Sequence, residues 1–414
     1  MKTKHAKQIR YLISSGIGAV LEWYDFVVFA YLAPFIASNF FPAEQRAVSL
    51  LQTYSAFALA YLVRPIGAIL FSYVGNRFGR KNSFLITFLL MSFATFFIGL
   101  LPTIHTVGML APVFLLLLRM MQGIAAGGEI GVASVYLFEL SEPKQRGFNC
   151  SAIWACSGIG MTLASAIVLL LTIIFKPVQL TAWVWRIPFL ITIFTAFIGF
   201  FLRRRLAETK QLYEMPTFSK NYFFALLPKI IFISVLFSFS AIMTYLVFVF
   251  LPTYINSLAH QSLLNVAVIS TTIILASTIL VPFFGYVSDK IINRKKMMLI
   301  GAVILIVAAI PLYKFTLSYN LMGISIGFAL FVLLAAIYQG PLTAFSIEQL
   351  APQSRLSVFA IAYNLGYCIV GGTAPVIALF FMQHYDITLF PAYYIMVFGI
   401  VVILFLLKLF KKLT

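Results

Sequence analysis

Long apolar runs separated by short polar segments dominate this sequence. A bilayer-spanning helix needs about 20 mainly apolar residues, and runs of that length fill nearly the whole chain. The pattern predicts twelve transmembrane helices and therefore an all-α membrane protein. The expected spans are 12–37, 49–74, 83–101, 110–138, 149–175, 185–202, 229–257, 263–288, 297–315, 320–347, 355–384 and 388–408.

Composition supports a membrane protein and excludes several other classes. The chain is 62% hydrophobic and 10% charged, whereas a soluble domain has roughly 45–50% apolar and about 25% charged residues. The short loops leave no room for a soluble catalytic domain, so we do not expect an enzyme. The three cysteines lie in apolar stretches and the four histidines lie near the chain start or in outer loops. We therefore expect neither a metal site nor another cofactor.

The basic residues are distributed unevenly between the two sides of the predicted bundle. The formal net charge is +18, and 23 of the 29 Lys and Arg residues fall on the side that holds both termini. This asymmetry follows the positive-inside rule. It predicts an integral protein of a bacterial cytoplasmic membrane with both termini in the cytoplasm, and it argues against nucleic acid as a partner.

Two polar passages occur twice along the chain. The segment 71–81 returns as 284–296, and the segment 139–146 returns as 348–355 with the same Glu-to-Arg spacing. Six predicted helices separate the copies, which indicates two six-helix halves in parallel orientation. The expected division is an N-terminal half at 1–202, a cytoplasmic linker at 203–228 and a C-terminal half at 229–414.

Several motifs carry a family resemblance. They lie at 18–26, 64–67, 119–129, 185–189, 363–375 and 391–394. With these motifs the chain resembles the metabolite:proton symporter family of the major facilitator superfamily, including its proline/betaine and 2-oxoglutarate symporters. The resemblance implies a central site between the halves and proton-driven import of a small metabolite, either an organic acid or a zwitterion such as proline or betaine.

Three positions depart from the patterns of these relatives. The facilitator signature after the second helix usually has Gly and Asp where this chain has Ser72 and Asn76. The inner gate of the first half has therefore lost one negative charge. The chain has Arg119 where the proline/betaine symporters carry Lys and the carboxylate-transporting relatives carry Arg, which favours an organic anion as substrate.

Ionisable residues inside predicted helices are candidates for the transport chemistry. Charges near the middle of a membrane are costly unless paired or hydrated. Glu22, Asp25 and Arg119 are expected at overlapping depths, and the two acids lie three residues apart on one helix. We expect both acids to face Arg119. Either acid, or Glu129 near the inner end of its helix, would bind the proton, unless these charges form a purely structural ion pair.

Polar and aromatic residues near these charges are candidates for contact with substrate. Arg119 is expected to bind the substrate carboxylate, with Gln122, Tyr24, Tyr245 and Tyr338 also contributing. Together with Trp23 and Trp154, these tyrosines would offer an aromatic surface to a quaternary ammonium group. The alternative for each aromatic residue is packing or contact with lipid.

A second set of charges is expected to form the inner gate. Its members lie at the inner ends of the helices in both halves: Arg64, Asn76, Arg77, Arg80, Glu139, Arg146, Asp289, Glu348 and Arg355. They would meet only when the cytoplasmic side is closed. The predicted protein is thus a monomeric secondary transporter in membrane lipid that imports its substrate with protons by alternating access. The alternatives are a proton-coupled efflux antiporter and a membrane receptor that binds without transport.

Overall fold

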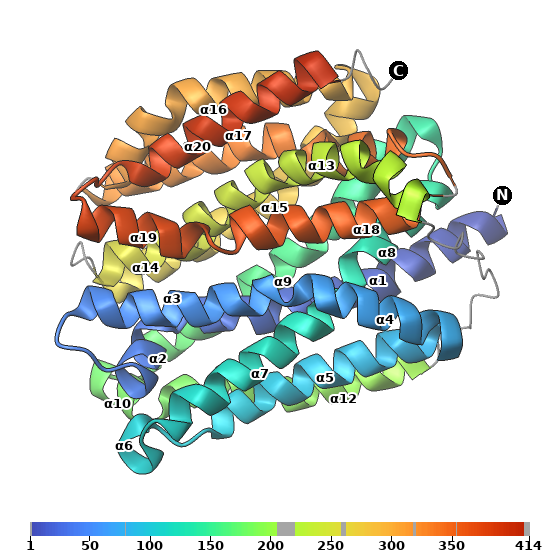
Figure 1. The fold of residues 1–414 in the computed structure, drawn as a ribbon. Coiled ribbons are helices and arrows are strands. Elements are labelled where there is room, and N and C mark those ends of the chain that lie inside the picture. Colours follow the sequence, from blue (N-terminus) through green and yellow to red (C-terminus); the bar gives the residue numbers. More distant parts are fainter. Residues whose placement is uncertain are drawn as a thin grey trace.

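The computed structural model describes residues 2–78, 80–204, 220–257, 262–317, 320–352 and 354–409. Within these ranges the secondary structure consists of helices and turns, without strands (Figure 1). The prediction of an all-α, twelve-helix membrane protein is confirmed. Eight described helices are long and apolar enough to cross a membrane, or nine with one bent pair, and shorter apolar helices lie at Leu85–Leu100, Leu110–Ala126 and Val184–Phe194.

The first half contains several spans that are divided into shorter helices. Its α-helices are α1 (Lys2–Tyr31), α2 (Ala33–Phe40), α3 (Arg46–Leu62), α4 (Arg64–Phe78), α5 (Arg80–Leu100), α6 (Ile104–Val107), α7 (Leu110–Ala126), α8 (Glu129–Leu140), α9 (Arg146–Ile174), α10 (Pro177–Ala182), α11 (Ile187–Leu190) and α12 (Thr192–Arg204). Two short 3₁₀ turns also occur, η1 (Pro143–Gln145) and η2 (Val184–Arg186).

The second half includes three π-helical segments. Its helices are α13 (Lys220–Met243), η3 (Thr244–Phe250), α14 (Leu251–Ser257), α15 (Leu263–Lys290), α16 (Arg294–Thr316), α17 (Leu321–Glu348), α18 (Arg355–Leu365), η4 (Gly366–Gly371), α19 (Ala374–His384), α20 (Phe390–Leu404) and η5 (Phe405–Leu409). The π-helical segments η3 and η4 lie inside long spans. Such segments are uncommon in helices and are often found at functional sites.

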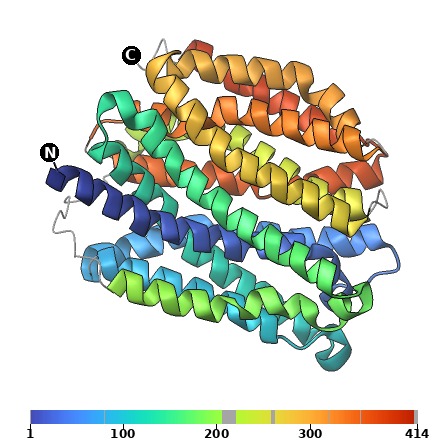
Figure 2. The same cartoon turned by 180° about the vertical axis from the view of Figure 1, so that it is seen from behind.

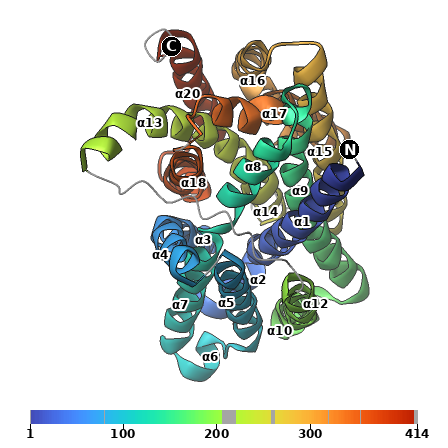
Figure 3. The same ribbon diagram turned by 90° about the vertical axis from the view of Figure 1, so that its right-hand side faces the viewer.

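The two halves lie side by side along the whole length of the bundle. Both chain termini lie at one end, on the right in Figure 1, and we call it the terminal end. The view from behind shows α9 running beside α15, and the view from the terminal end shows α1, α8 and α9 between the outer helices of the two halves (Figures 2 and 3). Residues from α1, α8, α9, η3 and α18 therefore meet in the interior.

Interruptions in the helices place special residues near this interior. Helices α1 and α2 meet at an angle of 61°, and Pro34 lies in the first turn of α2, where a proline is tolerated because its missing N–H would be unpaired anyway. Val63 separates α3 from α4, and Gly127–Gly128 separates α7 from α8. Arg64 directly follows the interruption at Val63, and Glu129 directly follows the interruption at Gly127–Gly128.

Candidate functional site

One buried ion pair joins α1 to α4. Glu22 and Arg64 are 4% and 1% exposed. Arg64 Nη2 lies 2.5 Å from Glu22 Oε1 and also donates a 3.3 Å hydrogen bond to the Ala126 carbonyl oxygen. The rings of Phe26 and Tyr61 lie 5.4 and 5.2 Å from the guanidinium carbon. Glu22 thus neutralises Arg64, and the pair connects α1, α4 and α7.

A second buried arginine lies on α7, and no carboxylate of the described residues forms an ion pair with it. Arg119 is 0% exposed. Its Nη1 atom donates a 2.7 Å hydrogen bond to Gln122 Oε1, and Gln122 Nε2 donates in turn to Thr95 Oγ1 at 2.7 Å. Three rings surround the guanidinium carbon: Phe29 at 4.1 Å, Phe26 at 4.9 Å and Phe57 at 5.4 Å. Within the described chain, Arg119 Nε and Nη2 have no hydrogen-bond partner, so this cation retains two donors for a ligand.

The expectation that both acids face Arg119 is wrong for Glu22. Counting residues along a helix gives the depth of a side chain but does not fix which neighbouring helix it faces. Arg64 is the first residue of α4, and its side chain extends to α1. Asp25 is 2% exposed and lies one helical turn from Glu22. The proton-binding role of either acid remains a prediction.

Aromatic side chains from both halves meet between the charged groups. Trp23 stacks with Tyr245 at a ring-centroid distance of 6.5 Å and contacts Trp154 edge-on at 6.4 Å. Trp154 stacks with Tyr367 at 5.6 Å. Tyr61 lies 4.9 Å from Tyr245 and also covers Arg64. We call Trp23, Trp154, Tyr245 and Tyr367 the central aromatic cluster.

Two of the predicted aromatic residues point elsewhere. The Tyr24 hydroxyl donates to the Pro188 carbonyl oxygen at 2.9 Å, and the Tyr338 hydroxyl donates to the Leu236 carbonyl oxygen at 2.9 Å. Each bond stays within one half of the protein. Both hydroxyls therefore serve packing in this structure, while Tyr245 lies in the central cluster as predicted.

The sequence interpretation missed three aromatic residues of this region. Phe57 and Tyr61 lie four residues apart on α3, so they share one helix face. This spacing, together with their position just before Arg64 in the sequence, could have identified both residues as candidates. Tyr367 lies in η4, and Tyr245 lies in η3. A π-helical turn rotates the following side chains relative to an α-helix, and nothing in the sequence pattern revealed where those turns occur.

Glu129 begins α8, directly after the interruption at Gly127–Gly128. Its backbone is described but its side chain is not, so its predicted proton-coupling role stays a prediction. The same holds for Asn76 and Arg77 on α4 and Arg80 at the start of α5. The predicted gate can therefore be examined through its other members.

The two copies of the repeated Glu-to-Arg passage pair with each other at the terminal end. Arg355 lies 3.5 Å from Glu139, and Arg146 lies 4.0 Å from Glu348. Each ion pair takes one residue from each half. The Phe138 ring lies beneath both arginines, 4.2 Å from the Arg146 guanidinium carbon and 4.9 Å from that of Arg355. Both pairs are partly exposed, and both join the halves.

Asp289 binds the beginning of α9 across the same boundary. Its Oδ1 and Oδ2 atoms accept 2.9 Å hydrogen bonds from the backbone N–H groups of Gly147 and Phe148. Arg294 forms an ion pair with Asp289 and another with Glu348 at 2.8 Å. Arg294 was not among the predicted gate residues. Of the predicted gate residues, Arg64 belongs instead to the buried pair with Glu22.

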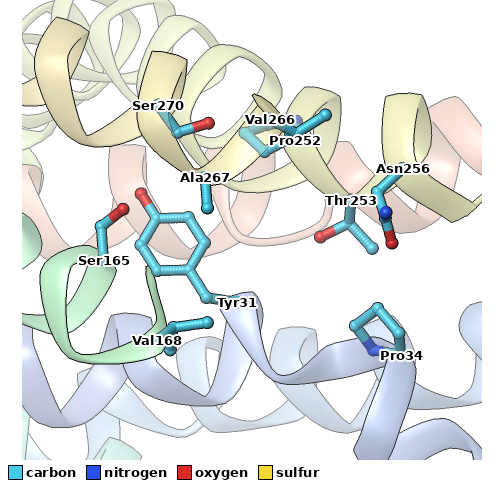
Figure 4. Close-up of a pocket in the computed structure, with 10 residues that line it drawn as sticks. All are labelled: Tyr31, Pro34, Ser165, Val168, Pro252, Thr253, Asn256, Val266, Ala267 and Ser270. Carbon is cyan, nitrogen blue, oxygen red and sulfur yellow. The ribbon is translucent and has the colours of Figure 1, made fainter. Parts of the chain in front are cut away.

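Contacts also join the halves at the opposite end of the bundle. Ser165 and Thr271 are hydrogen-bonded at 2.6 Å, and Thr253 donates to the Ala30 carbonyl oxygen at 3.5 Å. Figure 4 shows a small pocket of about 30 Å³ beside them, into which Tyr31 points. The buried charges and the central aromatic cluster thus lie between inter-half contacts at both ends.

The described residues contain no group of three or more His, Cys, Asp or Glu side chains that could hold a metal ion. Cys150, Cys156 and Cys368 are free thiols. The chemistry available in the interior is therefore that of paired and unpaired charges, amides and aromatic rings. This arrangement suits binding of a small polar molecule.

The chain belongs to the Major Facilitator Superfamily, whose sequence profile matches residues 16–375 and again residues 233–413. It is accordingly a multi-pass membrane transporter and not an enzyme. The fold agrees with this assignment. A proton:xylose symporter bound to 6-bromo-6-deoxy-D-glucose superimposes with a TM-score of 0.79 at 16% identity, covering 99% of this chain and 97% of that chain.

Curated relatives are more similar in sequence. A Staphylococcus aureus (strain MSSA476) protein named "Putative proline/betaine transporter" is 32% identical over 408 residues, which cover 95% of this chain and 87% of the relative. The "Proline/betaine transporter" of Escherichia coli (strain K12) is 29% identical over 413 residues, covering 94% of this chain and 81% of the relative. The resemblance to the proline/betaine symporters noted from the sequence motifs is confirmed.

Proposed function

We propose that this protein imports a small carboxylate-bearing metabolite together with protons, by alternating access, and that Arg119 binds the carboxylate. The observation that carries this proposal is the buried guanidinium of Arg119, whose Nε and Nη2 atoms find no hydrogen-bond partner in the part of the chain that the structure describes. An unpaired charge inside a membrane protein is costly. The planar donor fork of arginine matches a carboxylate, so a substrate carboxylate would supply the missing charge and hydrogen bonds.

The central aromatic cluster supports a zwitterionic substrate. Ring faces attract quaternary and secondary ammonium groups through cation–π interactions. Tyr61 and Phe57 connect this cluster to the two arginines: both rings contact Tyr245, and they cover Arg64 and Arg119 respectively. A molecule with a carboxylate at Arg119 and a cationic group toward Tyr245 would use both features. The names of the two relatives favour proline or betaine, while Arg119 alone would also accept an organic acid.

Glu22 is the better supported of the proton-binding candidates. Its carboxylate forms an ion pair with the buried guanidinium of Arg64. A proton on Glu22 would remove that attraction and leave Arg64 free to rearrange. The coupling would then act through Arg64 rather than through Arg119, with Asp25 one turn away as the alternative acid.

The orientation in the membrane follows from charge and fold together. Both termini lie at one end of the bundle, and the predicted topology assigns 23 of the 29 basic residues to this end. We assign it to the cytoplasm of a bacterial cell. The ion pairs at this end would form the closed inner gate of a protein that works as a monomer.

Transport by purified protein in liposomes tests this function. With a proton gradient directed into the lumen, we expect accumulation of betaine, proline or 2-oxoglutarate, each measured separately as radiolabelled substrate. Arg119→Gln should abolish uptake, whereas Arg186→Gln should preserve it because Arg186 stacks on Trp185 near the opposite end. Uptake that is independent of the proton gradient would reject symport. Binding without counterflow would indicate a receptor, and proton-driven uptake only under an outward gradient would indicate an efflux antiporter.

A further inference from the structure

Helices α8 and α18 contact each other from the gate to the level of the buried charges. At the terminal end, Glu139 of α8 pairs with Arg355, the first residue of α18. Farther inside, Gly131 touches Ala360 so closely that a Cβ added to Gly131 would lie 2.8 Å from the Ala360 Cβ. We call this line of contacts the α8–α18 seam. One helix belongs to each half, so the seam must separate whenever the terminal end opens.

At the end of the seam that is farthest from the terminal end, Asn364 forms a hydrogen bond between the two halves. This side chain is 2% exposed. Its Nδ2 atom donates to the Gly127 carbonyl oxygen of the first half at 2.9 Å and to the Ala360 carbonyl oxygen of its own helix at 2.9 Å. Gly127 lies at the interruption between α7 and α8. An interrupted helix releases carbonyl groups from the regular bonding pattern, and Asn364 binds one of them.

The neighbouring carbonyl at this interruption belongs to the buried ion pair. Arg64 donates to the Ala126 carbonyl oxygen at 3.3 Å while it pairs with Glu22. The backbones are in direct contact as well, since a Cβ added to Gly127 would lie 2.1 Å from the Arg64 carbonyl oxygen. Arg64 and Asn364 therefore bind two successive carbonyl groups, those of Ala126 and Gly127 respectively.

We propose that Asn364 is a positioning residue for transport that links the Glu22–Arg64 pair to the closing of the α8–α18 seam. With Glu22 charged, Arg64 holds the interruption in a position that presents the Gly127 carbonyl to Asn364, and the seam closes. When Glu22 accepts a proton and becomes a neutral acid, Arg64 loses its partner and the interruption loses that support. The seam then opens more readily. The proton step rests on the function proposed above, whereas the hydrogen bond and the seam do not.

Cysteine accessibility measures the state of the seam directly. Ser134 lies on α8, 1% exposed, three residues beyond Gly131 and therefore on a neighbouring position of the same face. We would introduce Ser134→Cys after replacing Cys150, Cys156 and Cys368, and measure its rate of labelling by a maleimide. Asn364→Leu keeps the size of the side chain but removes the donor. It should raise the labelling rate about fivefold, the shift that one hydrogen bond typically supports.

A matched control removes a similar bond that does not cross the seam. Ser234 donates to the Ala362 carbonyl oxygen at 3.0 Å, and both residues belong to the second half. Ser234→Ala should leave the labelling of Ser134→Cys unchanged. A reporter at the opposite end, Ser270→Cys beside the pocket in Figure 4, should be labelled more slowly in Asn364→Leu, because opening one end closes the other.

A second pair of variants tests the seam without altering Asn364. Gly131→Ala should raise labelling because its new methyl group would collide with Ala360. Adding Ala360→Gly should restore the original rate. If Asn364→Leu fails to fold, this pair of variants still tests whether the seam controls the opening of the terminal end.

Combining variants tests the link to Glu22. Glu22→Gln mimics the protonated acid and should raise labelling by itself, but should add little in the Asn364→Leu background. Unchanged labelling in Asn364→Leu and in Gly131→Ala would overturn the role of the seam. Independent, multiplicative effects of Glu22→Gln and Asn364→Leu would overturn the link. Wild-type protein without proton-driven accumulation would reject the proposed function instead, and the labelling results would still decide the role of Asn364 in closing the seam.

Discussion

The two buried arginines of the first half differ in their partners. Arg64 and Arg119 are 1% and 0% exposed, and aromatic rings cover both guanidinium groups. Arg64 has a carboxylate in contact, Glu22, and a backbone carbonyl as a second acceptor. Arg119 has only the neutral amide of Gln122 among the described residues. The two arginines are therefore equally buried but differ in whether a carboxylate of the described residues neutralises their charge.

This difference separates a structural charge from one that can bind a ligand. A buried cation that is already neutralised gains little from an arriving anion, whereas an unneutralised one gains both charge and hydrogen bonds. Under the proposed function, Arg64 stays bound to Glu22 until that acid is protonated, whereas Arg119 is the cation that receives the substrate anion. The first two predictions below, on stability and on substrate binding, would fail if the two arginines were equivalent.

The largest expected effect is on stability. Arg64→Met would leave the Glu22 carboxylate buried without its partner, and breaking a buried pair in this way costs about 3–5 kcal/mol. Arg119→Met removes a charge for which the described residues supply no counter-charge, so it should leave the protein equally stable or stabilise it. Unfolding of both variants in detergent, followed by tryptophan fluorescence with denaturant, would measure the difference.

The double variant Arg64→Met with Glu22→Gln serves as the control for that experiment. It removes both charges and should regain most of the lost stability. Equal destabilisation by Arg64→Met and Arg119→Met would contradict the distinction between the two arginines.

Stability should depend mainly on Arg64, whereas substrate binding should depend on Arg119. Arg119→Ala is expected to weaken binding about 100-fold or more, and Arg119→Lys about tenfold, because lysine retains the charge but loses the planar fork. Equilibrium binding of radiolabelled betaine or proline to purified protein measures this loss. The distant variant Arg186→Ala should bind normally. Unaltered affinity in Arg119→Ala would show that Arg119 is structural.

Energy coupling should depend on the acid that neutralises Arg64. Glu22→Gln is expected to abolish proton-driven accumulation while sparing exchange of substrate across the membrane. For a gradient of one pH unit and one proton per substrate, the loss is about tenfold in accumulation. Asp25→Asn, measured alongside, identifies the alternative acid. If Glu22→Gln accumulates substrate normally and Asp25→Asn does not, Asp25 binds the proton.

The smallest effect concerns a charge that one half has and the other lacks. Asp289 binds the start of α9, whereas the repeat places Asn76 at the matching position of the first half. Asn76→Asp should stabilise the closed terminal end by about a kcal/mol or less, so labelling of Ser134→Cys should slow a few-fold. Asp289→Asn should have the opposite effect. No response to Asn76→Asp would show that Asn76 has no energetic bearing on the gate.

Much of the fold could be predicted because hydrophobic runs and repeats are local signals. The twelve spans follow from apolar length, and the repeated Glu-to-Arg passage correctly marked Glu139, Arg146, Glu348 and Arg355 as residues that meet. Helix ends at one side of a membrane are brought together by topology alone. Such contacts need no knowledge of how each helix is rotated.

The interior of the site was harder to predict because it depends on helix rotation. Glu22 and Arg119 have similar depths, yet Glu22 turns toward Arg64. The π-helical segments that carry Tyr245 and Tyr367 add a local rotation that has no period in the sequence. Arg294 was overlooked because the sequence predicted it in a basic segment between two spans, where a charge is usually a solvent-exposed residue rather than a partner of Asp289.

The reciprocal ion pairs have a consequence for how this protein can evolve. Glu139 lies seven positions from Arg146 in the chain but pairs with Arg355, 216 positions away. A change of charge at position 139 would leave Arg355 without its ion-pair partner, whereas Arg146 would be unaffected. The compensating change would have to arise in the other copy of the repeat. Among homologous sequences, positions 139 and 355 should therefore vary together, as should 146 and 348.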